Sequence, residues 1–415
     1  MPLPALYPRF VEPRLREALE DSPAVLIHGP RQCGKTTLAR LAGKRDGYAY
    51  FNFDDEGTRS AAVSDPVGFV SDLPRRTILD EVQRVPHLFS ALKTVIDGDR
   101  APGRFLLTGS TNVLLLPKLA DSLAGRMSIV RLNPLAQCEL ARQRPDFINR
   151  LFGVGFKVRR WERLRDQLPT RIADGGYPAA LAVPGGHRRA RWYAAYVEAL
   201  VQRDVRNLAR IGSLTALPRL LALGAAGTAR MLNVTDLAGP FQLSRPTIRD
   251  YLTLLGQLFL LEELQPWHTN RLSRLVKTPK LHLCDTGLAC ALLGADAAGL
   301  KADRTLLGQL LETFVFQELK RQASWGKDPL SFFHFRDRDG VEVDLVIERG
   351  VQAVAGVEVK ASATVTGDDF RGLRKLKDAA GKRFAGGVVL YDGETSLGFG
   401  DTLHAVPIRA LWEPV

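Results

Sequence analysis

The chain has 415 residues, of which 45% are apolar and 25% charged, a composition typical of a folded globular protein with more than one hydrophobic core. No apolar run is long enough for a membrane span, the first residues lack a secretory pattern, and the four cysteines lack zinc-type pairing. These features predict a cytoplasmic protein with reduced thiols and no membrane partner. The net charge of +12 favours a polyanionic partner such as DNA, although an arginine-rich compositional bias would give the same charge.

The first predicted motif is a buried strand at 24–28 followed by a glycine-rich loop and a helix. The sequence Gly29-Pro-Arg-Gln-Cys-Gly-Lys-Thr36 fits the phosphate-loop pattern G-x-x-x-x-G-K-[ST]. Glycines keep side chains out of such a loop, so that backbone N–H groups and the helix N-terminus can surround phosphates. We therefore predict an ATP site in which Lys35 reaches the β- and γ-phosphates and Thr36 ligates Mg²⁺. Its predicted nucleotide-binding residues are Gly29, Pro30, Arg31, Gln32, Cys33, Gly34, Lys35, Thr36 and Thr37.

A second predicted strand, Thr77-Ile-Leu-Asp-Glu81, ends in two carboxylates. Two acids at a strand end are ordinary by themselves, but downstream of a phosphate loop they predict a hydrolysis site. Asp80 would hold Mg²⁺ through water, and Glu81 would be the catalytic residue that polarises the attacking water.

A third strand at 104–108 leads into Ser110 and Asn112, either of which could hydrogen-bond the γ-phosphate or cap a helix. Arg126 could stabilise the phosphoryl-transfer transition state as a catalytic residue, in its own subunit or from a neighbouring one. A solvated or ion-paired arginine would explain Arg126 nearly as well.

Four motifs in this region resemble the AAA+ ATPase family of bacteria and archaea in which an AAA-type core precedes a C-terminal domain of unknown function. They are Gly-Pro-Arg-Gln-x-Gly-Lys-Thr at 29–36, Leu-Asp-Glu-Val-Gln at 79–83, Leu-Thr-Gly-Ser at 107–110 and Leu-Ala-Gly-Arg at 123–126. The resemblance extends to Asp174-Gly-Gly-Tyr-Pro178 and to the C-terminal half. It implies ATP and Mg²⁺ as cofactors, and it leaves the substrate and the oligomeric state open.

The middle of the chain contains a helix-turn-helix pattern at 233–252. Its second helix would be capped by Ser244, and strand-like runs at 258–264 and 279–284 would add a winged hairpin. The residues expected on the surface of this second helix are Arg245, Thr247 and Arg249, and those expected to pack inward are Ile248, Leu252 and Leu255. The hairpin connection would carry Arg271, Arg274, Lys277 and Lys280. DNA contact and packing against the ATPase core are alternative uses of this module.

The C-terminal part places acidic residues on a helix and on two alternating strands. Glu312 lies on a predicted helix at 305–321, Asp344 on a strand at 341–347, and Glu358 and Lys360 share one face of a strand at 355–361. This order resembles the PD-(D/E)xK nuclease fold. In such a site Glu312, Asp344 and Glu358 would bind Mg²⁺, and Lys360 would be a catalytic residue that orients the nucleophilic water.

These patterns predict an α/β protein with three domains. A P-loop NTPase core with a parallel sheet spans 1–150, a helical winged-helix-like domain spans 151–300, and a small α/β restriction-endonuclease-like domain spans 301–415. The predicted function is that of an ATP-binding, Mg²⁺-dependent ATPase that regulates DNA binding or cleavage. The alternative is an ATP-dependent regulatory or scaffold protein whose nuclease-like domain is inactive and binds a protein partner. A signalling ATPase of a defence or toxin system is a third possibility.

Overall fold

A computed structural model of the protein describes residues 6–110, 123, 125–201, 216–231, 233–270, 278–400 and 402–414. The chain divides into two compact units. Arg9–Leu135 forms one, and Ala136–Val415 forms the other together with Met1–Pro8. None of the helices in these described ranges is both long and apolar enough to cross a membrane.

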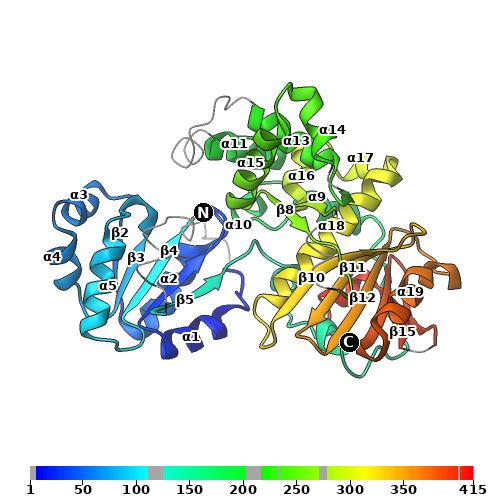
Figure 1. The fold of residues 1–415 in the computed structure, drawn as a ribbon, viewed down its shortest axis with the longest axis horizontal. Helices are drawn as coiled ribbons and strands as arrows, with labels where there is room; N and C mark the ends of the chain where they lie inside the picture. The colour runs from blue at the N-terminus through cyan, green and yellow to red at the C-terminus, as the bar shows by residue number, and fades with distance from the viewer. Residues whose placement is uncertain are drawn as a thin grey trace. The chain divides into compact units, whose positions relative to one another are not determined.

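The Arg9–Leu135 unit, drawn in blue to cyan in Figure 1, is built on one parallel sheet. Its strand order is β2-β3-β4-β1-β5, and every neighbouring pair is parallel. The strands are β1 (Ala24–His28), β2 (Ala49–Asn52), β3 (Thr77–Asp80), β4 (Phe105–Gly109) and β5 (Met127–Arg131). The helices are α1 (Glu12–Asp21), α2 (Lys35–Asp46), α3 (Glu56–Ser64), α4 (Pro66–Ser71) and α5 (Leu88–Gly98), with a 3₁₀ turn η1 (Val82–Arg84). The predicted parallel α/β core is confirmed.

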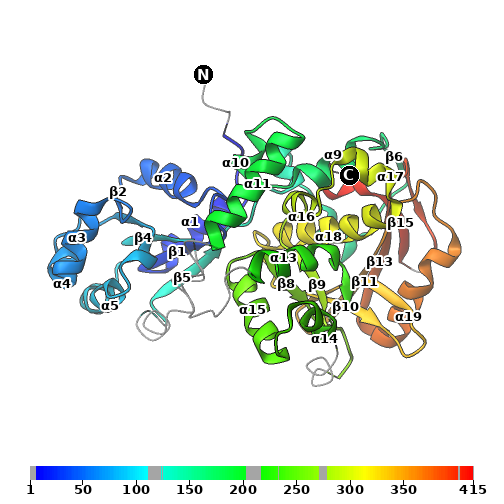
Figure 2. The same cartoon turned by 90° about the horizontal axis from the view of Figure 1, so that it is seen from above.

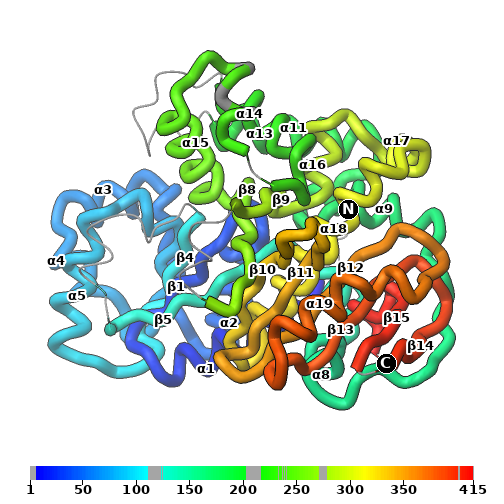
Figure 3. Tube along the Cα trace, turned by 45° about the vertical axis from the view of Figure 1, so that its right-hand side comes forward, coloured from blue at the N-terminus to red at the C-terminus, as the bar shows by residue number. Residues whose placement is uncertain are grey.

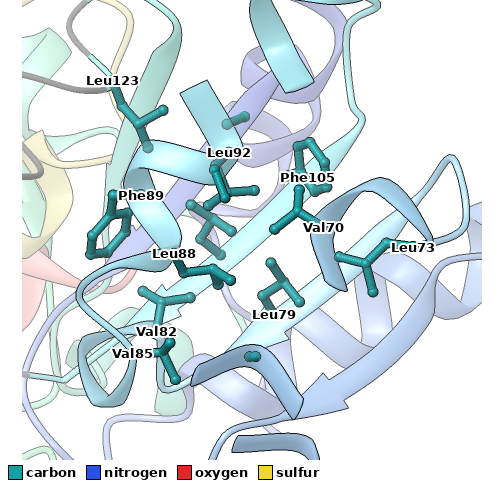
Figure 4. Close-up of a cluster of buried hydrophobic side chains, with 14 of the residues drawn as sticks. Val70, Leu73, Leu79, Val82, Val85, Leu88, Phe89, Leu92, Phe105 and Leu123 are labelled. Atoms are coloured by element: carbon teal, nitrogen blue, oxygen red, sulfur yellow. The ribbon is translucent and has the colours of Figure 1, made fainter. Parts of the chain in front are cut away.

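Both faces of this sheet are covered, which explains why its central strands are almost entirely apolar. On one face Leu79 and Phe105 pack with Phe89 and Leu92 of α5 in a continuous apolar cluster (Figure 4). On the other face Ile78 lies so close to α2 that only a glycine, Gly43, fits opposite it. Each fully buried Leu or Phe contributes roughly 1.5–3 kcal/mol of hydrophobic free energy. Strands with this two-sided burial can be recognised from sequence alone.

The parallel arrangement determines where the polar loops meet. Because β1, β3 and β4 are neighbours that run in the same direction, their carboxyl ends lie at one edge of the sheet. The phosphate loop follows β1, Glu81 follows β3, and Ser110 follows β4. The fold therefore brings three sequence-predicted segments to the same edge.

The second unit begins with a helical region, which confirms the predicted helical middle. Its helices are α7 (Gln137–Leu140), α8 (Phe147–Leu151), α9 (Gln167–Asp174), α10 (Pro178–Leu181), α11 (His187–Leu200), α13 (Ala216–Ala226), α14 (Val234–Ala238), α15 (Arg245–Gln257), α16 (Thr286–Leu293) and α17 (Ala297–Ala302). A small antiparallel sheet in the order β7-β9-β8 lies among them. Its strands are β7 (Arg230–Met231), β8 (Leu261–Leu264) and β9 (Lys280–Leu283).

The predicted cap, the inward-packing residues and the two surface arginines of the second helix are confirmed, whereas Thr247, predicted on the surface, is only partly exposed. The Ser244 side chain caps α15 by accepting a hydrogen bond from the Thr247 N–H at 3.3 Å. Ile248, Leu252 and Leu255 are buried. The two arginines of α15, Arg245 and Arg249, are exposed. Strands β8 and β9 pair as the antiparallel hairpin that the sequence suggests.

The C-terminal part is organised around helix α18 (Arg304–Ala323) and a mixed sheet. The sheet order is β10-β11-β12-β13-β15-β14-β6, in which β10 to β12 are antiparallel neighbours and β13 runs parallel to β12. Its strands are β10 (Leu330–Arg336), β11 (Glu342–Arg349), β12 (Ala353–Lys360), β13 (Phe384–Tyr391), β14 (Thr395–Gly398), β15 (Leu403–Pro407) and β6 (Arg159–Arg160), and α19 (Arg371–Ala380) packs on it. Helix α18 contacts β12 of this sheet and α16 of the helical middle. Figure 2 shows α18 beside α16. The two regions therefore share one central helix.

Candidate functional site

The phosphate loop follows β1 and leads directly into α2. Gly34, the N-cap of α2, has a φ of 100°, and Gln32 has a φ of 59°, so the loop turns twice through the left-handed region. A side chain at Gly29 would overlap the carbonyl oxygen of Leu132. The glycines are therefore required by the close approach of the backbone as well as by the turn.

Lys35 and Arg9 both hydrogen-bond to backbone carbonyl groups of this loop. The Lys35 Nζ donates hydrogen bonds to the carbonyl oxygens of Gly29 at 3.0 Å and Pro30 at 2.7 Å. The Arg9 guanidinium donates to the carbonyl oxygens of Cys33 at 2.7 Å and Asn133 at 2.6 Å. Arg9 was not identified in the sequence, because nothing in its local pattern indicates a contact with the loop.

Thr36 and Asp80, the two predicted Mg²⁺ ligands, are in direct contact. The Thr36 hydroxyl donates to Asp80 Oδ2 at 2.9 Å, and the Tyr50 hydroxyl donates to the same oxygen at 2.7 Å. Thr108 donates to the other carboxylate oxygen. Burial and the hydrogen bond to Asp80 raise the pKa of Tyr50, which keeps its phenol a donor. A hydroxyl beside a carboxylate at the end of a phosphate loop is the oxygen set that Mg²⁺ prefers, so these residues fit the ion.

Glu81 is held by polar neighbours rather than pointing freely into solvent. Its backbone φ is 60°, and its N–H donates to Thr108 Oγ1 at 3.1 Å. Its Oε2 accepts hydrogen bonds from the Ser110 hydroxyl at 3.0 Å and from the Gln83 side-chain amide. The structure thus brings the predicted base and the predicted γ-phosphate sensor together. Gln83 was not identified as a site residue. Asn112, the other predicted sensor, lies outside the described residues.

Arg126 lies at the opposite edge of the sheet. It directly precedes β5, whose first residue pairs with Ala24 at the start of β1, whereas the phosphate loop follows the end of β1. At about 3.3 Å per residue, the length of β1 separates the two edges by roughly 13 Å. Arg126 instead forms a two-pronged ion pair with Asp97 of α5, at 2.7 and 2.9 Å. The predicted action of Arg126 in its own subunit is therefore wrong on geometric grounds, and action on a neighbouring subunit stays a prediction.

The second candidate site is the carboxylate cluster of the C-terminal sheet. Asp344 on β11 accepts a hydrogen bond from the Val359 N–H at 2.9 Å, and Lys360 on β12 forms an ion pair with Glu358 at 2.9 Å. Burial and the nearby Asp344 carboxylate raise the pKa of Glu312, and the same two causes raise the pKa of Glu358 to about 8. These shifts agree with the convergence of the predicted acidic residues.

Lys280 enters the same cluster from β9. Its Nζ lies 2.8 Å from Glu312 Oε1, 3.6 Å from Asp344 Oδ1 and 3.8 Å from Glu342 Oε2, and its side chain is only 4% exposed. The expectation that Lys280 lies on the hairpin connection is therefore wrong, because Lys280 is the first residue of β9 and its side chain enters the carboxylate cluster. Arg271, Arg274 and Lys277, the other members of that connection, lie outside the described residues.

The residues of this cluster do not fit a divalent metal ion. Across the described part of the chain, no group of three or more His, Cys, Asp or Glu side chains is arranged to hold one. The lysine ammonium already contacts oxygens of three of the carboxylates, and a divalent cation would have to share those oxygens with it. The metal-ligand roles of Glu312, Asp344 and Glu358 remain predictions from sequence.

Three family models each match a different part of the chain. Residues 21–141 match the family model described as an AAA domain, residues 165–299 match a domain of unknown function (DUF8612), and residues 307–411 match another (DUF4143). Two uncharacterized proteins, Rv2008c of Mycobacterium tuberculosis and Mb2031c of Mycobacterium bovis, are each 31% identical over 398 residues. Those residues are 95% of this chain and 82% of each relative.

Solved structures give weaker similarities. A Walker-type ATPase of Pyrococcus abyssi is 17% identical, covers 69% of this chain and 96% of its own length, and gives a TM-score of 0.44. The ORC2 protein of Aeropyrum pernix is 16% identical, covers 71% and 93% respectively, and gives a TM-score of 0.32.

The parallel sheet, the phosphate loop and the contact between Thr36 and Asp80 define an ATP-binding ATPase domain. The chain belongs to the AAA+ ATPase family, and the two mycobacterial proteins are its relatives.

Proposed function

We propose that the protein hydrolyses ATP with Mg²⁺, using Thr36 and Asp80 to hold the ion and Glu81 to activate the attacking water. The observation that carries this proposal is the hydrogen bond between Thr36 and Asp80, which join the phosphate loop to the end of β3. Mg²⁺ held by Thr36 and Asp80 would neutralise the negative charge that develops on the phosphates.

The chain's own residues have distinct parts in this proposal. Lys35 exchanges its two loop carbonyls for phosphate oxygens when nucleotide binds, which costs little because its ammonium stays hydrogen-bonded. Glu81 accepts a proton from water as the water oxygen attacks the γ-phosphorus. The bond between that phosphorus and the β–γ bridging oxygen breaks, which releases ADP and inorganic phosphate. Ser110 and Gln83 fix the direction of the Glu81 carboxylate.

The variant Glu81→Gln tests the base, because it keeps the size and hydrogen bonds of the side chain but cannot accept the proton. We expect kcat for ATP hydrolysis to fall by about 10²-fold or more while ATP still binds. Glu17→Gln, an exposed glutamate on α1, is the matched control and should keep full activity. Undiminished hydrolysis by Glu81→Gln would remove Glu81 from the mechanism.

The C-terminal part supports a second proposal, about its fold. Helix α18, the antiparallel strands β10 to β12, helix α19 and the parallel strand β13 follow one another in the order of the PD-(D/E)xK core that the sequence resembles. We propose a nuclease-like fold for residues 301–415. Of the two activities considered for it, the contacts of Lys280 favour the alternative in which the domain does not cleave nucleic acid.

A cleavage assay separates these two activities. Wild-type protein and Asp344→Ala would be incubated with DNA and RNA in Mg²⁺ or Mn²⁺, with and without ATP. We expect no cleavage by either protein. Cleavage by the wild type that is lost in Asp344→Ala would restore the nuclease hypothesis.

DNA binding is proposed separately for helix α15. Arg245 and Arg249 are exposed on it and could contact phosphates. We expect the double variant Arg245→Ala/Arg249→Ala to weaken binding of a fluorescent DNA duplex and to reduce its salt dependence, as the loss of two phosphate contacts requires. Unchanged binding would favour a packing role for the module.

A further inference from the structure

Lys280 is fixed in position by the strand that carries it. It lies in β9, the central strand of the small sheet, where it pairs with Leu264 of β8 on one side and Met231 of β7 on the other. Its backbone is therefore held from both sides, and its side chain has little freedom to leave the carboxylate cluster.

Three further contacts tie this sheet and its flanks to the C-terminal domain. The Trp267 indole N–H donates to Glu348 at 2.8 Å, and the ring nitrogen Nε2 of His334 lies 3.2 Å from the Thr278 carbonyl oxygen. Lys320 of α18 forms an ion pair with Glu262 of β8. Strand β8 also lies beside β10, as Figure 3 shows. These contacts hold the small sheet, and with it the backbone of Lys280, against the C-terminal domain.

The ammonium of Lys280 balances the negative charge of the carboxylates in the cluster, as a bound metal cation would. Glu312 and Asp344 come from a helix and from a strand of the C-terminal domain, and both lie within ion-pair distance of Lys280 Nζ. Buried carboxylates without a cation would repel one another strongly in this poorly solvated region. The remaining buried carboxylate, Glu358, has its own lysine, Lys360. Lys280 and Lys360 thus pair with the three carboxylates for which the sequence predicts metal-ligand roles.

We infer that Lys280 takes the place of a divalent metal ion in the C-terminal carboxylate cluster, so that this domain is built to work without metal. The inference rests on the nuclease-like fold proposed above, since that fold is what leads us to expect a metal here. It makes the C-terminal domain a metal-independent module of an otherwise Mg²⁺-dependent ATPase. Removal of the ammonium should then create a requirement for a divalent cation.

The test compares thermal unfolding of the full-length protein in EDTA and in Mn²⁺. All proteins carry Asp80→Asn, so that the phosphate loop adds little to the Mn²⁺ response. We expect Lys280→Ala to lower Tm in EDTA by about 5–10 °C, as loss of a buried ion-pair partner requires, and Mn²⁺ to restore at least half of that loss. Adding Asp344→Asn to Lys280→Ala should abolish the restoration. Lys320→Ala, which removes a lysine from another partly buried ion pair of α18, is the matched control and should show no Mn²⁺ rescue.

A Mn²⁺ count by electron paramagnetic resonance keeps the inference testable if Lys280→Ala does not fold. Protein that retains Lys280 should bind the same number of Mn²⁺ ions with and without Asp344→Asn. One additional ion that depends on Asp344 would overturn the inference, and so would a folded Lys280→Ala that Mn²⁺ rescues no better than Lys320→Ala. Neither measurement reads ATP hydrolysis or DNA cleavage, so failure here is distinguishable from failure of the proposed function.

Discussion

The Ser110 hydroxyl donates a hydrogen bond to Glu81 Oε2 at 3.0 Å, although the two residues follow different strands. The contact exists because β3 and β4 are parallel neighbours, and the Glu81 N–H is in turn bound by Thr108 near the end of β4. The end of one strand thereby sets the orientation of the carboxylate at the end of the next. In a parallel α/β fold, this is how a catalytic group can be positioned by residues far away in sequence.

Ser110→Ala tests this positioning. Loss of one hydrogen bond to a charged group should cost about 1.5 kcal/mol, so we expect kcat for ATP hydrolysis to fall roughly 10-fold. The KM for ATP should change little if Ser110 acts through Glu81, and should rise if Ser110 holds the γ-phosphate of bound ATP. Steady-state kinetics distinguish the two. Ser90→Ala, at an exposed position on α5, should match the wild type.

Thr36→Val tests the Mg²⁺ site separately from the nucleotide site. The substitution keeps the shape of the side chain but removes the hydroxyl that contacts Asp80. We expect the affinity for a fluorescent ATP analogue to fall about 10-fold in Mg²⁺, the loss of roughly one ligand interaction. The affinity in EDTA should equal that of the wild type. An equal loss in both conditions would indicate damage to the phosphate loop rather than to the metal site.

The nucleotide site could be predicted from sequence because its signals are local. A buried strand, a glycine-rich loop and a helix start follow one another within 24–36, and each parallel strand is apolar because both of its faces are covered. The positions of Arg9 and Tyr50 were not predictable in this way. Arg9 reaches across 124 residues to the Asn133 carbonyl, and no local pattern records that contact.

The C-terminal cluster illustrates the same limit. The alternation of β11 and β12 predicts which faces carry Asp344, Glu358 and Lys360. Lys280 lies 32 residues before its partner Glu312 in the chain. Its presence in the cluster depends on how a separate small sheet packs against α18. Electrostatic matching of such distant segments is decided only by tertiary packing, so the pattern that placed Lys280 on the hairpin connection did not predict its ion pairs with Glu312 and Asp344.

The ion pair between Arg126 and Asp97 allows a test of the role left open for Arg126. Both side chains are partly exposed, so solvent screens the pair and it should contribute little to stability. If Arg126 serves only this pair, Arg126→Ala and Asp97→Ala should lower Tm to the same small extent and leave kcat for ATP hydrolysis unchanged at all protein concentrations. A loss of activity confined to Arg126→Ala, and growing with protein concentration, would instead show action on a neighbouring subunit.

Glu318 makes the stability of the second unit depend on pH. It is fully buried on α18, where it accepts a hydrogen bond from the Gln137 N–H at 2.8 Å and pairs with Arg321 at 3.2 Å. Burial outweighs these favourable contacts and raises the pKa of Glu318 to about 7, above the ordinary value near 4.3 in an unfolded chain. Between those two values the folded state holds a proton that the unfolded state has lost. The stability that this bound proton of Glu318 contributes is therefore fully present at low pH, and it is lost as the pH rises through about 7.

Glu318→Gln removes this proton equilibrium while keeping the size of the side chain. Relative to that variant, the free energy of unfolding of the wild type should fall by on the order of 2 kcal/mol from about pH 5 to about pH 7.5. Urea denaturation followed by tryptophan fluorescence measures the difference, since Trp412 packs edge-on against Phe314 of the same helix. Glu263→Gln, at an exposed position of β8, should retain the pH slope of the wild type. Parallel slopes for the wild type and Glu318→Gln would mean that Arg321 keeps Glu318 ionised throughout, and that the buried pair is formed by two charges at every pH tested.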